Sequence, residues 1–167
     1  MDAERERLFA ERAREVDRPL VYVNAIGGQD ELVFDGASFV LGADNKLLAK
    51  APSWTEDGAV TQWNRSGESW TCEEAAIATA PGLTESIYRA LVLGLRDYVN
   101  KNGFKSVVLG LSGGIDSAIC AALAVDALGE ERLHAIMLPY KYTSSESLAD
   151  AEICAKMLGC RYDVVPI

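Results

Sequence analysis

The sequence of 167 residues predicts an α/β chain whose second half forms a parallel β-sheet covered by helices. Two observations support this prediction. From residue 106 onward, short apolar runs alternate with longer segments in which apolar residues recur at helical spacing. Strands connected in that way run parallel and are joined by right-handed crossovers. The first half instead shows several short strands separated by turn residues, so we expect two parts of different architecture.

The first part begins with a charged helix. Residues 4–15 carry their apolar side chains loosely on one helical face, which predicts a solvated amphipathic helix lying on a sheet. Strands are predicted where β-branched and aromatic residues gather between turn residues, at 20–24, 32–34, 38–41 and 46–51.

Residues 52–84 are predicted to be a linker, because no helix or strand period holds across them and Pro and Gly interrupt them repeatedly. Trp54, Trp63 and Trp70 favour a segment that packs along its neighbours over a free tether. An aromatic cage for a ligand is the alternative interpretation of these tryptophans.

A strong helix is predicted after the linker, from Glu85 to about Asn102. Thr84 is placed to cap it, and Gly103 is placed to end it. Its expected buried stripe consists of Ile87, Leu91, Leu95 and Val99.

Three strands are predicted for the sheet of the second part, at residues 106–109, 133–138 and 161–165. The segment 118–128 should form the helix between the first two strands. A further helix should end near Leu158. Its start is predicted from the capping-box spacing of Thr143 and Glu146, and Gly159 is a suitable stop.

The most specific pattern lies between the first of these strands and its helix. It reads Gly110, Leu111, Ser112, Gly113, Gly114, Ile115, Asp116 and Ser117. Adjacent glycines let backbone N–H groups approach an anion without an obstructing Cβ. The two hydroxyls and the N-terminus of the helix add further donors, so we expect the loop to hold phosphate. Asp116 would repel phosphate unless a cation lay between them, and Mg²⁺ is the cation we expect there.

Two better-known phosphate loops do not fit. A Walker loop places a lysine before its hydroxyl residue, whereas Asp116 precedes Ser117 here. The dinucleotide turn G-x-G-x-x-G does not match the spacing of the glycines in this loop. A plain strand-to-helix turn capped by an Asp and a Ser is the remaining alternative.

Polar residues also follow the second strand of the predicted sheet. Thr143, Ser144, Ser145 and Ser147 lie beyond its carboxyl end, at the same sheet edge as the phosphate loop. That edge is where open parallel sheets bind ligands. Helix capping explains Thr143, whereas the serines are candidates for a substrate role.

Other reactive residues are interpreted as structural. An acidic group at residues 30, 31 and 35 could hold a metal, but a solvated or locally capped loop is the favoured interpretation. His134, the only histidine, is expected to be a satisfied core residue without a carboxylate partner nearby. Cys120 and Cys154 are expected to be core thiols.

The motifs resemble those of a known family. The pattern S-G-G-x-D-S, here Ser112–Ser117, is similar to the loop of the ATP pyrophosphatases, which cleave ATP to AMP and pyrophosphate. L-S-G-G-I-D-S, M-L-P-Y-K-Y-T-S-S-E-S and D-A-E-I-C-A-K-M-L-G follow one another in the order found in the synthetase module of NAD⁺ synthetase. Residues 19–24 and 27–38 resemble the last part of a nitrilase-type amidase domain. The two resemblances together point to the glutamine-dependent NAD⁺ synthetase family.

The resemblance implies a domain organisation. Residues 1–51 would be the end of a nitrilase-type glutamine amidohydrolase domain, itself a partial α/β segment, and 52–84 the linker. Residues 85–167 would begin a Rossmann-like, doubly wound sheet of the adenine nucleotide alpha hydrolase type. The Glu–Lys–Cys triad of the amidase should lie upstream of Met1, so no catalytic residue of that reaction is expected in this chain. The sequence is therefore expected to be the middle of a longer protein.

The resemblance also implies a reaction. The parent enzyme would make NAD⁺ from nicotinic acid adenine dinucleotide, ATP and glutamine through an adenylated intermediate. Residues 110–117 would bind ATP, Asp116 would bind Mg²⁺, and the enzyme would be a homo-oligomer. Two rivals remain: a phosphate-binding module without turnover, and another ATP pyrophosphatase such as a tRNA-modifying sulfurtransferase or GMP synthetase. The chain by itself is expected to bind rather than to catalyse.

The composition of the chain argues against binding to nucleic acid or membranes and bears on the cellular compartment. A net charge of −9 argues against nucleic acid, which is bound through Lys and Arg. No apolar run approaches the roughly 20 residues that span a bilayer. The four cysteines form no C-x-x-C pair, which favours a reducing, cytoplasmic setting and counts against the tRNA-modifying enzyme.

Overall fold

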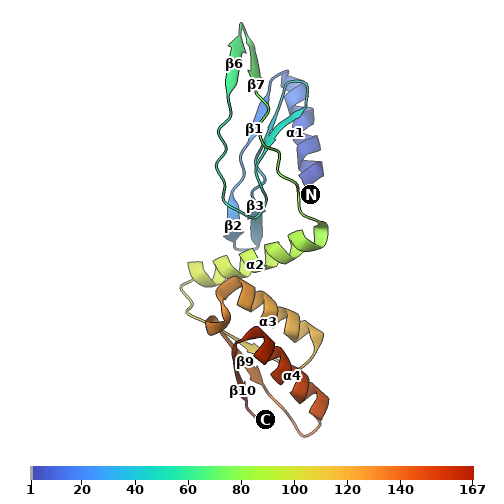
Figure 1. The fold of residues 1–167 in the computed structure, drawn as a ribbon, viewed down its shortest axis with the longest axis vertical. Coiled ribbons are helices and arrows are strands. Elements are labelled where there is room, and N and C mark those ends of the chain that lie inside the picture. The colour runs from blue at the N-terminus through green and yellow to red at the C-terminus, as the bar shows by residue number, and fades with distance from the viewer. Residues whose placement is uncertain (1) are drawn as a thin grey trace. The chain divides into compact units, whose positions relative to one another are not determined.

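The computed structural model describes the backbone from Asp2 and the side chains from Glu4 to Ile167. The chain forms two compact units (Figure 1). The first unit contains the chain up to Gly27 together with Val33–Ser86, and the second contains Gly28–Leu32 together with Ile87–Ile167. No helix of the described residues is long and apolar enough to span a membrane.

In the first unit a helix precedes short strands, as predicted. The elements are α1 (Asp2–Val16), β1 (Leu20–Tyr22), β2 (Ile26–Gln29), β3 (Leu32–Asp35), β4 (Phe39–Leu41) and β5 (Leu47–Lys50), with β2 and the first residue of β3 reaching into the second unit. β1, β4 and β5 form an antiparallel sheet in the order β1-β4-β5. Phe9 of α1 contacts this sheet through the rings of Tyr22 and Phe39, with centroid distances of 4.5 and 6.0 Å.

Ion pairs fasten α1 as well. Arg5 donates two hydrogen bonds of 2.8 Å to the two carboxylate oxygens of Asp35, and the Asn24 amide donates a third. Lys50 Nζ lies 2.6 Å from Glu6 Oε1. Asp35 is buried, so its interpretation as part of a solvated acidic loop was wrong. Nor do the described residues contain a group of three His, Cys, Asp or Glu side chains placed to hold a metal.

The segment predicted to lack regular structure contains a β-hairpin. β6 (Trp63–Ser66) pairs antiparallel with β7 (Ser69–Cys72). Gly67 turns the chain with a φ of +63°, a conformation that glycine adopts without strain. These strands were not predicted because their side chains are mostly exposed and so show no apolar alternation. Trp63 packs on the core of the sheet, whereas 42% of the Trp70 surface is exposed.

In the second unit three parallel strands lie in the order β10-β9-β8. The elements are α2 (Leu83–Lys101), β8 (Val107–Gly110), α3 (Ile115–Leu128), a short 3₁₀ helix (Glu130–Arg132), β9 (Leu133–Met137), α4 (Ser145–Leu158) and β10 (Arg161–Val164). The order strand, helix, strand, helix, strand is as predicted, and the α/β class with a parallel sheet is confirmed.

Small residues bring the helices close to the sheet. The core between them consists of Leu111, Ala121, Ala124, Leu133, Ala135, Met137, Ala151 and Ala155. All four helix residues in this set are alanines, so the helix backbones approach the strands closely. The larger side chains of the core come from the loop and from β9.

Only one face of the sheet is covered within the described residues. α3 and α4 both pack on the side that carries Leu133, Ala135 and Met137. Both crossovers add a strand in the same direction, and right-handed crossovers of that kind place their helices on one face. The second helical layer of a doubly wound sheet is therefore not seen here. Val108 of β8 points to the uncovered face and is therefore 67% exposed.

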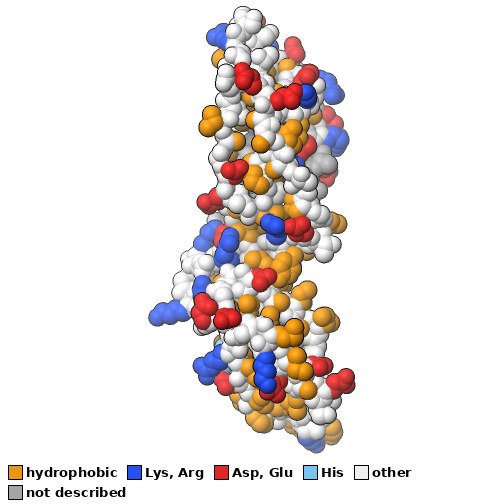
Figure 2. Space-filling model, in the orientation of Figure 1, with side chains coloured by type: hydrophobic (Ala, Val, Ile, Leu, Met, Phe, Trp, Pro, Cys, Tyr) orange, Lys and Arg blue, Asp and Glu red, His pale blue; other side chains and the backbone are white. Residues whose placement is uncertain are grey.

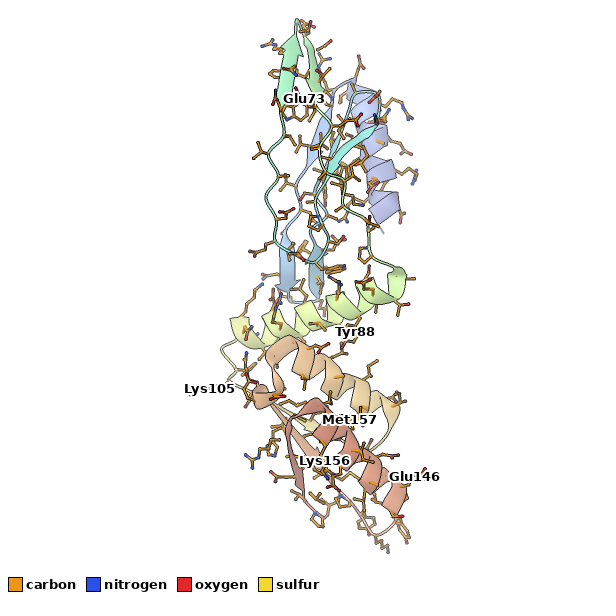
Figure 3. The ribbon with its side chains drawn as sticks, in the orientation of Figure 1. Glu73, Tyr88, Lys105, Glu146, Lys156 and Met157 are labelled. Carbon is orange, nitrogen blue, oxygen red and sulfur yellow. The ribbon has the colours of Figure 1, made fainter. Side chains whose placement is uncertain are left out.

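The helix α2 begins one residue before the predicted cap, Thr84, which lies in its first turn. Its packed stripe also differs from the prediction. Ile87 and Leu91 are more than half exposed. Instead Tyr88 donates a 2.7 Å hydrogen bond to Asp126 of α3 (Figure 3). The residues that α2 contributes to the adjoining apolar cluster are Val92, Leu95 and Val99. The prediction was correct for Leu95 and Val99. In the first half of the helix the packed positions are shifted by one residue from those predicted.

The outer surfaces of α3 and α4 carry exposed apolar side chains (Figure 2). Ile119, Ile153 and Met157 are at least half exposed. Cys120 is exposed on the same helix as Ile119, so its prediction as a core thiol was wrong. Cys154 does pack against the core of the unit.

A histidine and an aspartate join β9 to β10. Nε2 of His134 lies 2.7 Å from Oδ2 of Asp163, and Arg161 donates to the same carboxylate oxygen. The predicted lack of a carboxylate partner for His134 was wrong, because the parallel register brings together residues that are 29 positions apart. The hydrogen bonds from His134 and then from Arg161 lower the pKa of Asp163 below its ordinary value of 3.8.

This pair predicts a pH dependence of stability. Because the pKa of Asp163 is lowered in the folded state, its contribution is fully present above the ordinary carboxyl pKa and is lost as the pH falls through the lowered value. Asp163→Asn should therefore reduce the thermal midpoint at pH 7 and make it fall less between pH 5 and pH 2 (about the range in which carboxyl groups titrate). Asp150→Asn, which removes an exposed carboxylate of α4, is the control. Equal acid sensitivity of wild type and Asp163→Asn would contradict the assignment.

Candidate functional site

The predicted phosphate loop is anchored to the neighbouring strand. β8 ends at Gly110, and the next residue, Leu111, is buried and donates a 2.9 Å backbone hydrogen bond to Ile136 of β9. α3 begins at Ile115, three residues before the predicted start. Asp116 and Ser117 therefore belong to its first turn, where backbone N–H groups have no partner within the helix.

Two serine hydroxyls close the loop on itself. Ser112 Oγ and Ser117 Oγ lie 3.0 Å apart. Ser117 Oγ accepts from the Ser112 N–H at 3.2 Å and donates to the Gly114 carbonyl at 2.9 Å, and the Gly114 N–H lies 3.3 Å from Ser112 Oγ. These bonds are exposed, so the hydroxyls lie at the surface of the loop. A ligand that reaches them can take the place of one of their present hydrogen-bond partners.

Gly113 cannot carry a side chain. Its φ is +79°, and a Cβ built on it would lie 2.3 Å from the backbone oxygen of Ser147. The loop thus touches the first turn of α4 backbone to backbone. Glycine at this position is required both by the left-handed conformation and by the contact.

Asp116 is the one charged residue of the loop. It is exposed in the first turn of α3, where the positive end of the helix dipole favours a carboxylate. Among the side chains described, from Glu4 to Ile167, it has no ion-pair or side-chain hydrogen-bond partner. A single free carboxylate beside a phosphate site fits Mg²⁺, which is commonly held by one or two carboxylates, substrate phosphates and water.

The loop borders a pocket of about 510 Å³ at the carboxyl ends of β8 and β9. The residues that line it are Gly110, Leu111, Ser112, Ile136, Met137, Leu138, Tyr142, Thr143, Ser144 and Ser147. All of these are uncharged. The pocket therefore offers hydroxyls, backbone groups and apolar surface, and any charge of a ligand must be balanced from outside its lining.

The loop after β9 contributes one wall, as the shared sheet edge predicted. Ser144, not Thr143, is the N-cap of α4, and its hydroxyl accepts from the Ser147 N–H. Thr143 instead closes the preceding turn, since its hydroxyl accepts from the Tyr140 N–H and its own N–H donates to the Tyr140 carbonyl. The capping box was misplaced because a Ser-rich run offers several equivalent caps, and only the path of the turn selects one. Gly159 ends the helix in the left-handed conformation, as predicted.

Sequence reasoning did not find the apolar wall of the pocket. Ile136, Met137 and Leu138 were assigned to a strand, and Tyr142 received no role. The signal that was available is the position of these residues at the end of a parallel strand, next to a loop that follows the same edge.

Other candidate nucleophiles do not line this pocket. Cys72 is on β7 of the first unit, and burial, followed by the neighbouring Glu73 carboxylate, raises the pKa of its thiol. A raised pKa disfavours the thiolate that nucleophilic catalysis needs. His134 is engaged with Asp163 and is absent from the lining of the pocket.

Comparison with known proteins gives a consistent result. The NAD synthase family model matches residues 87–167. A glutamine-dependent NAD(+) synthetase of Rhodobacter capsulatus is 47% identical over 163 residues, which cover 98% of this chain and 30% of the relative. One from Synechocystis sp. is 42% identical over 98% of this chain and 29% of the relative.

Solved structures agree with the sequence matches. The glutamine-dependent NAD+ synthetase from Acinetobacter baumannii, in complex with ADP, superposes with a TM-score of 0.89 at 41% identity. The match covers 99% of this chain and 31% of that one. A glutamine-dependent NAD(+) synthetase from Cytophaga hutchinsonii, 21% identical, shares the fold with a TM-score of 0.75 over 99% of this chain and 33% of that one. The chain thus spans about 30% of the length of its relatives, and it belongs to the family of the glutamine-dependent NAD⁺ synthetases.

Proposed function

We propose that this chain provides the ATP-binding loop of an enzyme that makes NAD⁺ from nicotinic acid adenine dinucleotide, ATP and glutamine. The observation that carries the proposal is the loop Gly110–Ser117, which has ordered hydroxyls and a free carboxylate but no lysine. ADP bound to the related Acinetobacter baumannii protein supports an adenine nucleotide as the ligand.

The proposed reaction has two steps. A carboxylate oxygen of the nicotinate group bonds to the α-phosphorus of ATP, and the bond from that phosphorus to the β-phosphate oxygen breaks to release pyrophosphate. Ammonia then attacks the activated carboxyl carbon and AMP leaves, which completes the amide. A loop that holds the β- and γ-phosphates leaves the α-phosphorus open to attack.

The residues of the loop would act by positioning and charge neutralisation. Ser112, Gly113, Gly114 and Ser117 would hold the leaving pyrophosphate. The buried Leu111 fixes one end of the turn, and α3 begins at the exposed Ile115 at the other end. Mg²⁺ bound by Asp116 would neutralise the charge that builds up on the pyrophosphate. No side-chain nucleophile is needed for this chemistry.

Other parts of the proposal rest on the family alone. Ammonia would come from the amidase reaction, to which residues 1–51 would contribute only structure, and residues 52–84 would link the two domains. A homo-oligomer in the cytoplasm is the expected setting. Nucleotide binding without turnover is the activity proposed for the 167-residue chain by itself.

A chimera tests the proposal directly. The aligned 163-residue segment of the Rhodobacter capsulatus relative is replaced by this chain, and the product is supplied with labelled ATP, nicotinic acid adenine dinucleotide and glutamine. AMP and pyrophosphate should appear in step with NAD⁺. Formation of ADP and orthophosphate as the primary products would refute the proposed cleavage at the α-phosphate.

Asp116→Asn in the same chimera should lower kcat by about 100-fold or more, equivalent to about 2.7 kcal/mol of transition-state stabilisation. The Kd for ATP should change much less, because the metal is needed most when the leaving pyrophosphate gains charge. Rapid-quench turnover and equilibrium ATP binding measure the two effects. Asp150→Asn serves as the control for loss of one exposed carboxylate from the unit. Equal losses in binding and turnover would contradict the assigned role.

Gly113→Ala should destabilise the unit and abolish ATP binding. The left-handed φ alone costs a non-glycine residue about 1–2 kcal/mol, and the contact with the Ser147 oxygen adds to this cost. Gly110→Ala is the steric control for folding, because its Cβ meets nothing within 4 Å. Urea unfolding should show a loss for Gly113→Ala that Gly110→Ala lacks. Similar stabilities for the two variants would show that the contact with α4 is dispensable.

A further inference from the structure

The site described above has a shortage of positive charge. Its pocket is lined only by uncharged residues, and its loop carries the carboxylate of Asp116. The 167 residues carry a net charge of −9. A polyphosphate remains anionic with one Mg²⁺ bound, and a further cation close to the pocket would strengthen its binding through a charge-assisted hydrogen bond.

One basic side chain is available in the two loops that border the pocket. Residues 110–117 contain no Lys or Arg, and residues 138–147 contain Lys141 alone. The neighbouring residue, Tyr142, lines the pocket. The turn that carries Lys141 is closed by the two hydrogen bonds between Tyr140 and Thr143, so its place at the rim is fixed.

Lys141 is held by aromatic rings rather than by a carboxylate. Its Nζ lies 4.8 Å from the ring centroid of Tyr142 and 5.7 Å from that of Tyr140. The two rings are themselves in edge-to-face contact, with centroids 5.9 Å apart. Within the described part of the chain Lys141 forms no ion pair. By contrast, Lys101, Lys156 and Arg161 of the same unit each face an acidic side chain.

We propose that Lys141 is the cation that binds the phosphates of the nucleotide held by residues 110–117, and that the tyrosine pair holds it at the rim until a nucleotide arrives. The inference rests on the proposed ATP-binding function. A cation–π contact at an exposed site is weaker than a charge-assisted hydrogen bond to phosphate, so the ammonium exchanges one for the other. The flexible four-carbon stem of lysine permits this movement while the backbone of the turn stays in place.

In this arrangement Lys141 performs the charge-balancing role of a Walker lysine from a different loop. The Walker lysine belongs to the phosphate loop itself, whereas Lys141 belongs to the loop after the neighbouring strand. A lysine placed there approaches the phosphates from the wall of the pocket, and the loop position before Ser117 is left to Asp116.

The test uses the full chain with inorganic pyrophosphate and Mg-ATP as probes. Lys141→Gln should raise the Kd for both about tenfold, the change expected from losing a hydrogen bond to a charged group. Lys141→Arg should retain most of the affinity. Lys105→Gln is the matched control, because Lys105 is an exposed lysine just before the amino end of β8, the opposite end of the strand from the pocket (Figure 3).

A spectroscopic readout separates binding from a merely structural role. The ε-methylene resonance of Lys141 should be shifted upfield by the two rings in the free chain and should move toward its ordinary position when pyrophosphate binds. Wild-type affinity in Lys141→Gln, or a Lys141 resonance that does not move, would overturn this inference and leave the proposed function intact. Failure of the unchanged chain to bind either probe would overturn the proposed function, and the role of Lys141 with it.

Discussion

The parallel pairing of β8 with β9 is the constraint on which the candidate site depends. Its register continues one residue past β8, where the buried Leu111 donates its N–H to Ile136. This pairing places the carboxyl ends of both strands at one edge. The two loops that follow, at residues 110–117 and 138–147, therefore become the two sides of a single pocket.

The second requirement is close packing between the loop and α4. Alanines on α3 and α4 allow both helices to approach the strands, and Gly113 then meets the backbone of Ser147 without an intervening side chain. A larger residue at the alanine positions of α4 or at Gly113 would move α4 away from the loop. The hydroxyls of Ser112 and Ser117 owe their positions to this framework, because their own hydrogen bonds are exposed and individually weak.

The electrostatics of the site differ from those of most phosphate sites. Backbone N–H groups, hydroxyls and a helix N-terminus provide the donors, and the one charge within the loop is negative. Under the proposed function, the cations that balance the phosphates would come from outside the loop, namely a metal ion and Lys141. In the proposed reaction the loop would surround the β- and γ-phosphates, which form the leaving group.

The sequence by itself determined the features that depend on local chemistry. The apolar periods of the second part predicted its three strands and its helices, and the left-handed Gly159 marked the end of α4, because these signals act within a few residues. The assignment of residues 110–117 to a phosphate site likewise rests on residue type and spacing, and it stays a prediction. The motif order pointed to the family that the comparisons show.

Only the tertiary structure decided what depends on distant contacts. The partner of His134 is 29 residues away, and the choice of Ser144 over Thr143 as N-cap follows from the turn before it. The phase of the packed stripe on α2 is set by where Val99 and Tyr88 meet α3, and the exposed face of β8 is set by the side to which both crossovers turn. Period and propensity are local properties of the chain, whereas register and the covered face of a sheet are set when separate segments pack together.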